Sequence, residues 1–294
     1  MTQTSFKFPN TYIIGVQKAG TTSLHYWLSQ HPQIFAPIHL KDADYFADPE
    51  EAKNVRSNLQ RDLRDYDEEK IILHSYVNYI LFEDALKRIN HYSPKAKIIV
   101  LLRDPVERAL SAYRYNKKIN KEKRSLEEAL IYTPKDKLTY SKDACNFTYL
   151  EHGMYGRQLK RVFKFFGRNQ VLILDFLELK KDPKNLIRKV FAFLDVDDTY
   201  QPVLQKKNVT GSTRNGIWHR MLTKPSIVRS WIVKLFLSWW LPRKKRNAIV
   251  KYLIDLNTKD TETTDPPIQL KNKLAKYFEE DQEVLRVILD SENS

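Results

Sequence analysis

The segment spanning residues 12–24 constrains the fold more than any other part of the chain. An apolar run over residues 12–16 predicts a buried strand, and apolar side chains at helical spacing follow from Leu24. The loop between them contains two glycines, one lysine and three consecutive hydroxyl side chains. A helix begins with unpaired N–H groups and the positive end of its dipole, so this strand–loop–helix unit predicts a site for a phosphate-like anion.

This loop differs from the P-loop of nucleoside triphosphatases. Gly15 and Gly20 have the P-loop spacing, but Thr21 stands where that motif has its lysine, and the lysine of this loop is Lys18. The lysine and the magnesium-binding hydroxyl therefore cannot play their usual parts. A phosphate-type ligand held without a metal is the simpler interpretation, and a glycine-containing turn without a ligand is the alternative.

Composition limits the class of protein without naming it. The 294 residues are 42% hydrophobic, which is enough for a substantial core in one large or two small domains. Fifty Lys and Arg against 36 Asp and Glu give a formal charge of +14, which favours an anionic ligand or surface. The single cysteine excludes an intrachain disulfide. With no visible signal peptide and no membrane-length apolar stretch, we expect a cytoplasmic protein.

Alternating strand and helix patterns predict the fold class. Strands are expected over residues 12–16, 33–37, 70–74, 97–102 and 170–175, and helices over 80–91, 104–118, 153–166 and 185–194. This alternation predicts an α/β fold, a P-loop-like parallel sheet flanked by helices. Strand signals vanish from about residue 201, and residues 270–289 are helical. We therefore expect one domain over residues 1–294, with an α/β core at 10–200 and a mostly helical C-terminal part at 201–294.

A second candidate anion loop follows the most strand-like segment of the chain. Arg103 comes directly after that segment, and Ser111 lies two turns into the helix that follows. Because parallel strands end at the same edge of a sheet, this loop and the first one should converge. A guanidinium and a hydroxyl together suit a phosphate monoester, although an ion pair of Arg103 with Asp104 or Glu107 is an alternative. Arg108 and Tyr115 are on the same helix face as Ser111.

Both loops resemble motifs of the sulfotransferases that use 3′-phosphoadenylyl sulfate (PAPS). Residues 18–23, Lys-Ala-Gly-Thr-Thr-Ser, are similar to the 5′-phosphosulfate loop of that family. Residues 102–113, Leu-Arg-Asp-Pro-Val-Glu-Arg-Ala-Leu-Ser-Ala-Tyr, are similar to its 3′-phosphate motif. The resemblance covers roughly residues 10–200, and it is to sulfotransferases that modify heparan-type sugars and to their bacterial relatives.

The resemblance implies roles for individual residues. The phosphosulfate would be held by Lys18, Ala19, Gly20, Thr21, Thr22 and Ser23, and the 3′-phosphate by Arg103 and Ser111, with Arg214 as a further contact. Lys18 would also neutralise charge on the bridging oxygen as the sulfuryl group leaves. A preorganised cation lowers the barrier of such a step, and no metal is required.

The general base for the acceptor is less determined. In the sugar-modifying relatives a glutamate that follows a lysine supplies it, and here Asp42 takes that place with a side chain one methylene shorter. Asp44 and His39 are further candidates from the same segment. His74 is another, although a buried structural histidine is an equally good interpretation of it.

The sequence therefore predicts an enzyme, a PAPS-dependent sulfotransferase that releases adenosine 3′,5′-bisphosphate. The acceptor would be a hydroxyl, with an amine as second choice, on a carbohydrate, glycolipid or small molecule. Nucleic acid is not expected as a partner.

Residues 227–246 combine tryptophans with a basic run, which fits either peripheral contact with an anionic membrane or a helix packed on the sheet. The alternatives to a sulfotransferase are a magnesium-dependent P-loop kinase and a basic polyanion-binding protein. Oligomeric state and acceptor identity are not determined by the sequence.

Overall fold

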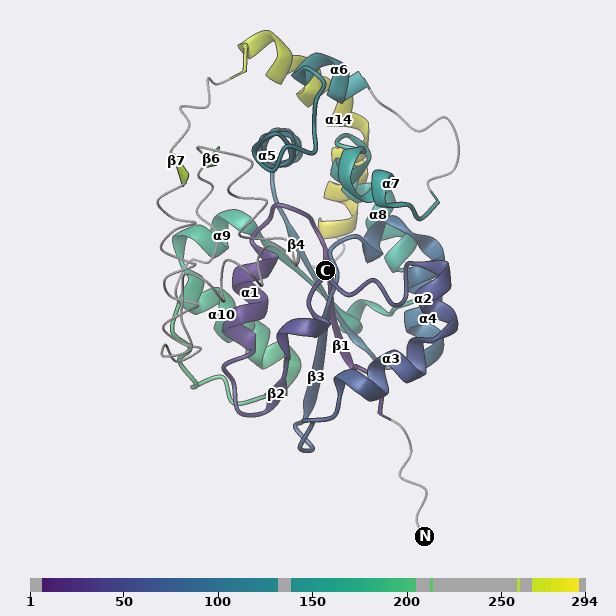
Figure 1. Cartoon of the computed structure of the whole chain (residues 1–294). Helices are drawn as coiled ribbons and strands as arrows, with labels where there is room; N and C mark the ends of the chain where they lie inside the picture. The colour runs from purple at the N-terminus through teal and green to yellow at the C-terminus, as the bar shows by residue number, and fades with distance from the viewer. Residues whose placement is uncertain (1–6, 132–138, 205–211, 214–257, 260–265, 291–294) are drawn as a thin grey trace, which may run out of the picture.

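A five-stranded parallel sheet forms the centre of the protein (Figure 1). The computed structural model describes residues 7–131, 139–204, 212–213, 258–259 and 266–290. The strands are β1 (Thr11–Gly15), β2 (Ile34–Phe35), β3 (Ile71–Ser75), β4 (Lys97–Leu102) and β5 (Val171–Asp175), in the order β2-β3-β1-β4-β5. All four neighbouring pairs are parallel, so the predicted α/β fold class is confirmed.

Helices cover both faces of this sheet. The α-helices of the described residues are α1 (Thr21–Leu28), α2 (Pro49–Lys53), α3 (Val55–Asp62), α4 (Glu83–Tyr92), α5 (Pro105–Lys118), α6 (Leu126–Ile131), α7 (Lys142–Phe147), α8 (Tyr155–Val162), α9 (Phe176–Lys181), α10 (Pro183–Leu194) and α14 (Ile268–Asp290). Figure 1 shows α1, α9 and α10 on one side of the sheet and α3 and α4 on the other. With both faces covered, every residue of β1 and β3 is buried, which explains their nearly continuous apolar runs.

The helix that follows β4 begins as the sequence predicts. The Asp104 carboxylate accepts a hydrogen bond from the Glu107 N–H at 2.7 Å, and Pro105 occupies the first helical position. A carboxylate at this place satisfies a donor that the helix itself leaves unpaired, and proline lacks such a donor. The cap therefore fixes where α5 starts, directly after Arg103.

The C-terminal helix α14 packs against α5 and α8. Its Asp281 carboxylate accepts hydrogen bonds from the N–H groups of Gly156 and Arg157, at 2.8 and 2.9 Å, in the first turn of α8. A Cβ atom at Gly156 would lie 2.5 Å from the Asp281 carbonyl oxygen. Only glycine allows this approach, so the contact between the two helices requires Gly156.

Two features lie beyond the α/β core. Strands β6 (Ser212–Thr213) and β7 (Thr258–Lys259) form an antiparallel pair, which differs from the expected absence of strands after residue 201. Two-residue strands are too short to leave an alternating pattern in a sequence. Within the described ranges no helix is both long and apolar enough to cross a membrane. The segment at residues 227–246 lies outside the described residues.

Candidate active site

The two predicted anion loops meet at the carboxyl edge of the sheet. Strands β1 and β4 are neighbours, and the Val16 N–H donates to the Leu101 carbonyl at 3.0 Å. The Arg103 guanidinium donates from Nη1 to the Lys18 carbonyl oxygen, also at 3.0 Å. The expected convergence is therefore confirmed, at the edge where parallel α/β sheets bind their ligands.

The first loop has the backbone geometry of an anion cradle. Gly20 has a φ of 90° directly before α1, and a Cβ atom there would lie 3.3 Å from Leu179 of α9. Both the left-handed backbone and the close packing therefore require glycine. Gly20 occupies the N-cap position and has no side chain to cap α1, and the first turn of the helix contains no acidic residue. The positive end of the helix is thus left for an anion, beside the hydroxyls of Thr21, Thr22 and Ser23.

Lys18 adds a cation to this cradle. Its Nζ lies 4.0 Å from the centroid of the Tyr115 ring, on α5. Burial, together with repulsion from Arg103, Lys118 and Arg108, lowers the pKa of Lys18 to about 8. A group of cations that repel one another is stabilised by an anion placed among them. The electrostatics of the site therefore favour an anionic ligand.

The Arg103 side chain packs against α9 and approaches Glu107 of α5. Its guanidinium carbon is 4.8 Å from the centroid of the Phe176 ring, and the side chain is largely shielded from solvent. Nη2 also approaches the Glu107 carboxylate at 3.9 Å, so the ion pair considered as an alternative exists as a long contact. Glu107 is shared with Arg114 at the same distance. Ser111 is partly exposed on α5.

Arg108 has a different environment from the other residues on its helix face. It is fully buried, and its Nη2 donates to the Tyr149 carbonyl oxygen. Burial lowers the pKa of Arg108 to about 10. Tyr115, by contrast, is 39% exposed. Arg108 therefore belongs to the packing of α5, whereas Ser111 and Tyr115 lie on the accessible part of the helix.

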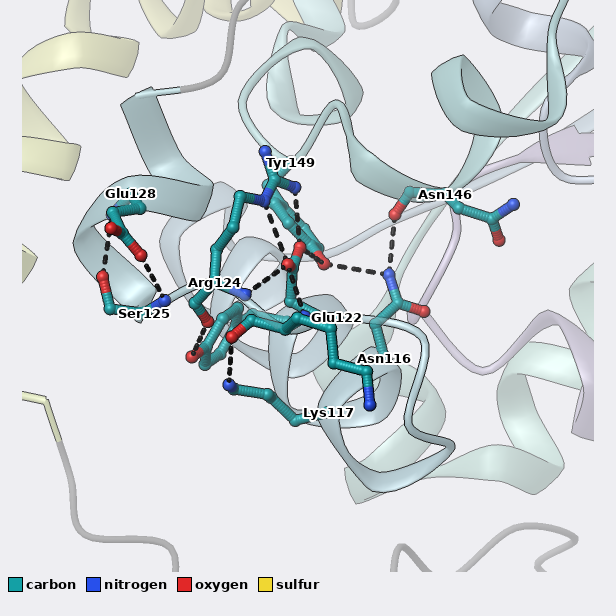
Figure 2. A network of polar contacts seen from close by, with 10 residues as sticks. Asn116, Lys117, Glu122, Arg124, Ser125, Glu128, Asn146 and Tyr149 are labelled. Carbon is teal, nitrogen blue, oxygen red and sulfur yellow. Dashed lines mark hydrogen bonds and ion pairs between the residues drawn. The ribbon is translucent and has the colours of Figure 1, made fainter.

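A polar network fixes the C-terminal end of α5 (Figure 2). The buried Glu122 carboxylate accepts hydrogen bonds from Arg124 Nη2 at 2.7 Å and from Tyr149 Oη at 2.9 Å. Asn116 of α5 donates to the same Tyr149 Oη at 3.0 Å and to the Asn146 carbonyl at 2.7 Å. Hydrogen bonds from Arg124 lower the pKa of Glu122 to about 2. The helix that follows Arg103 is thus anchored at both ends.

The candidate base Asp42 lies next to the same edge of the sheet. Its N–H donates to the carbonyl of Ser75, the last residue of β3, at 2.7 Å. Its carboxylate is exposed and lies 2.7 Å from Nζ of Lys41, whose side chain is buried. A left-handed φ of 66° turns the backbone at Asp42. An exposed carboxylate and a shielded lysine are therefore held beside the end of β3, next to β1 in the sheet.

The other base candidates differ in accessibility. Asp44 accepts a hydrogen bond from Tyr140 Oη. The side chain of His39 lies outside the described part of the chain. His74 is fully buried, and burial lowers its pKa to about 3. Its ring packs against the rings of Tyr12, Tyr45, Phe46 and Tyr79. Of the two interpretations of His74, the structure favours the buried structural histidine.

Sequence reasoning did not anticipate two contacts of this region. His25 of α1 shares a 2.7 Å hydrogen bond with Ser75 Oγ, which joins the helix of the first loop to the strand beside Asp42. The contact between Lys18 and Tyr115 is the second. The position of Tyr115 on the Ser111 face was the only sequence signal for it. Arg214 lies outside the described residues, so its predicted contact stays a prediction.

A parallel α/β sheet, an uncapped helix behind a glycine loop and a cationic second loop define a P-loop-like protein for an anionic nucleotide. Comparison with known families places it more narrowly. Residues 8–210 match the family model described as the sulfotransferase domain, and the chain belongs to that family.

Individual relatives agree with this assignment. The chain is 27% identical over 234 residues to bifunctional heparan sulfate N-deacetylase/N-sulfotransferase 4 of Mus musculus, covering 73% of this chain and 25% of that protein. It is 28% identical over 238 residues to the corresponding enzyme 3 of Homo sapiens, covering 75% and 26%. The chain thus spans about a quarter of the length of these relatives.

A solved structure is similar over most of its length. The sulfotransferase from Alicyclobacillus acidocaldarius aligns with a TM-score of 0.57 and 26% identity, covering 87% of this chain and 98% of that one.

Proposed function

We propose that this chain transfers a sulfuryl group from PAPS to an acceptor and releases adenosine 3′,5′-bisphosphate. The observation that carries the proposal is the 3.0 Å hydrogen bond from Arg103 to the Lys18 carbonyl, which joins two cationic loops at one edge of the sheet. Two adjoining anion sites suit a nucleotide with phosphate groups at both its 3′ and 5′ positions. Membership of the sulfotransferase family supports the same ligand.

The described residues fit this co-substrate. The uncapped start of α1 and the loop residues Lys18, Ala19, Gly20, Thr21, Thr22 and Ser23 would hold the phosphosulfate, and Arg103 and Ser111 would hold the 3′-phosphate. The described ranges contain no group of three or more His, Cys, Asp or Glu side chains that could hold a metal ion.

The residues have distinct parts in the transfer. The acceptor oxygen forms a bond to sulfur while the bond from sulfur to the bridging phosphate oxygen breaks, and the bonding electrons stay on that oxygen. The Lys18 ammonium neutralises the charge that develops there. The acceptor proton passes to the Asp42 carboxylate, which is exposed and held beside β3. Lys41 keeps this carboxylate in place before the acceptor arrives.

For the acceptor we propose a carbohydrate. The relatives are named for heparan sulfate and for N-sulfotransferase activity, which supports a sugar as the acceptor. An amine of that sugar is therefore a candidate acceptor group beside a hydroxyl. Paired substrates separate the two. A glucosamine oligosaccharide with free amines accepts at nitrogen and at oxygen, whereas its N-acetylated form accepts only at oxygen.

Radiolabelled PAPS, the purified chain and these oligosaccharides test the proposal. We expect label to pass to the sugar in the presence of a chelator, and adenosine 3′,5′-bisphosphate to inhibit the transfer. Magnesium-dependent transfer of the terminal phosphate of ATP would instead indicate a kinase. Salt-sensitive binding of polyanions without any affinity for the bisphosphate would indicate a polyanion-binding protein.

A further inference from the structure

The Lys18 ammonium contacts an aromatic ring. Its Nζ lies 4.0 Å from the centroid of the Tyr115 ring. Within the part of the chain that the structure describes, Lys18 Nζ forms no ion pair and no side-chain hydrogen bond. The ring face carries the negative part of the aromatic quadrupole, so it attracts a cation placed over it. The contact joins the first anion loop directly to α5.

The groups around Lys18 disfavour the charged form of its side chain. Arg103 and Arg108 repel its ammonium, as does Lys118 at the end of α5. Burial also disfavours the charged form. Among the described groups that act on Lys18, the Tyr115 ring is the one that favours the ammonium.

We propose that Tyr115 is a positioning residue for Lys18. The face of its ring keeps the Lys18 ammonium charged and in place beside the first anion loop until the phosphosulfate binds. This inference rests on the proposed function, because it assigns Lys18 to the leaving-group side of the transfer. An aromatic ring suits the task better than a carboxylate. A carboxylate would form an ion pair that competes with the anionic co-substrate, whereas the ring attraction is weak enough for a phosphosulfate to replace it.

Two substitutions separate the ring from the rest of the side chain. Tyr115→Phe keeps the ring face and removes only the hydroxyl, whereas Tyr115→Leu keeps apolar bulk and removes the quadrupole. Tyr115 is 39% exposed, so both variants should fold, and their thermal unfolding is measured to verify this.

The first readout needs no nucleotide. The rate at which an acylating reagent modifies Lys18 is followed against pH by mass spectrometry of the labelled peptide, since only the neutral amine reacts. We expect Tyr115→Leu to lower the apparent pKa of Lys18 by roughly half a unit, and Tyr115→Phe to leave it unchanged. An unchanged pKa in the leucine variant would overturn the inference, as would an equal shift in the phenylalanine variant.

The second readout is turnover with PAPS. Tyr115→Leu should lower kcat by about fivefold and move the alkaline limb of kcat/KM to lower pH, and Tyr115→Phe should restore both. An active wild type with an unaltered leucine variant would overturn this inference alone. A wild type that labels as expected but transfers no sulfuryl group would overturn the proposed function instead.

Discussion

At the scale of single residues, the unusual position of the loop lysine has a structural explanation. Lys18 has a left-handed φ of 70°, a conformation that costs a non-glycine residue about 1 kcal/mol. The hydrogen bond from Arg103 to its carbonyl holds that conformation. In this backbone the side chain reaches Tyr115 on α5. A lysine at position 18 thus lies between the two anion loops.

The lowered pKa of Lys18 predicts an alkaline limit to activity. Its pKa of about 8 in the free protein means that kcat/KM for PAPS should fall above that pH, as the ammonium loses its proton. The alkaline fall of kcat itself should lie at higher pH, because a bound anion favours the charged form of Lys18. Rates measured from neutral to alkaline pH test this. Lys18→Arg stays charged, so its residual activity should lack the limb, and a limb that persists there would contradict the assignment.

The exposed carboxylate of Asp42 predicts a variant that binds but does not turn over. Asp42→Asn removes the proton acceptor and keeps the shape, so kcat should fall by about 100-fold or more while the affinity for adenosine 3′,5′-bisphosphate is retained. Asp44→Asn is the matched control, since the Asp44 carboxylate accepts a hydrogen bond from Tyr140. Turnover retained in Asp42→Asn and lost in Asp44→Asn would move the base to Asp44.

At the scale of elements, α5 brings the second anion loop to the first. It begins at the Asp104 cap directly after Arg103, and its other end is tied through Asn116 to Tyr149 and the buried Glu122 (Figure 2). The cap was predictable from an acid followed by proline. The network was not, because Tyr149 and Glu122 are 27 residues apart in the sequence.

The Glu122 network predicts a loss of stability with a defined pH dependence. Glu122→Gln should lower the free energy of unfolding by about 1–2 kcal/mol at neutral pH, because it removes the charge that Arg124 and Tyr149 contact. The native pKa of Glu122, about 2, lies below that of the unfolded chain, so its contribution is present above the unfolded pKa and is lost as pH falls toward 2. Urea denaturation of both proteins from neutral to acid pH measures this.

The control for this prediction is Glu128→Gln on the same stretch. The Glu128 carboxylate accepts a hydrogen bond from the Ser125 N–H at 2.8 Å but is exposed, so its loss should be the smaller one. Equal losses from the two glutamates would show that the buried network is not what stabilises this end of α5.

The contact between α8 and α14 predicts that a methyl group added at Gly156 strongly destabilises the fold. In Gly156→Ala the added Cβ would meet the Asp281 carbonyl oxygen at 2.5 Å, and backbone cannot move aside as a side chain can. We expect a loss of about 2–3 kcal/mol in urea denaturation. Gly167→Ala is the control, because its nearest neighbour is the amide oxygen of the Asn169 side chain, which can rotate away. A tolerated alanine at position 156 would contradict this packing of α14.

At the scale of the whole molecule, the sequence predicted the sheet and the place of the site better than the surroundings of its residues. Apolar runs predicted the strands, and parallel pairing implied that the loops at Lys18 and Arg103 meet. The enclosure of His74 could not be predicted, because the rings around it come from four positions between residues 12 and 79. The docking of α14 through Asp281 likewise depends on a partner 125 residues away.

Lys18 and Arg103 together are expected to hold one nucleotide that has phosphates at its 3′ and 5′ positions. Calorimetry with adenosine 3′,5′-bisphosphate tests it most directly, on wild type, Lys18→Ala and Arg103→Ala. Arg168→Ala is the control, since it removes one positive charge at the amino end of β5, away from the site edge. We predict that each site variant loses about tenfold or more in affinity, whereas the control binds like wild type. Undiminished binding in both site variants would show that these two loops do not hold the nucleotide.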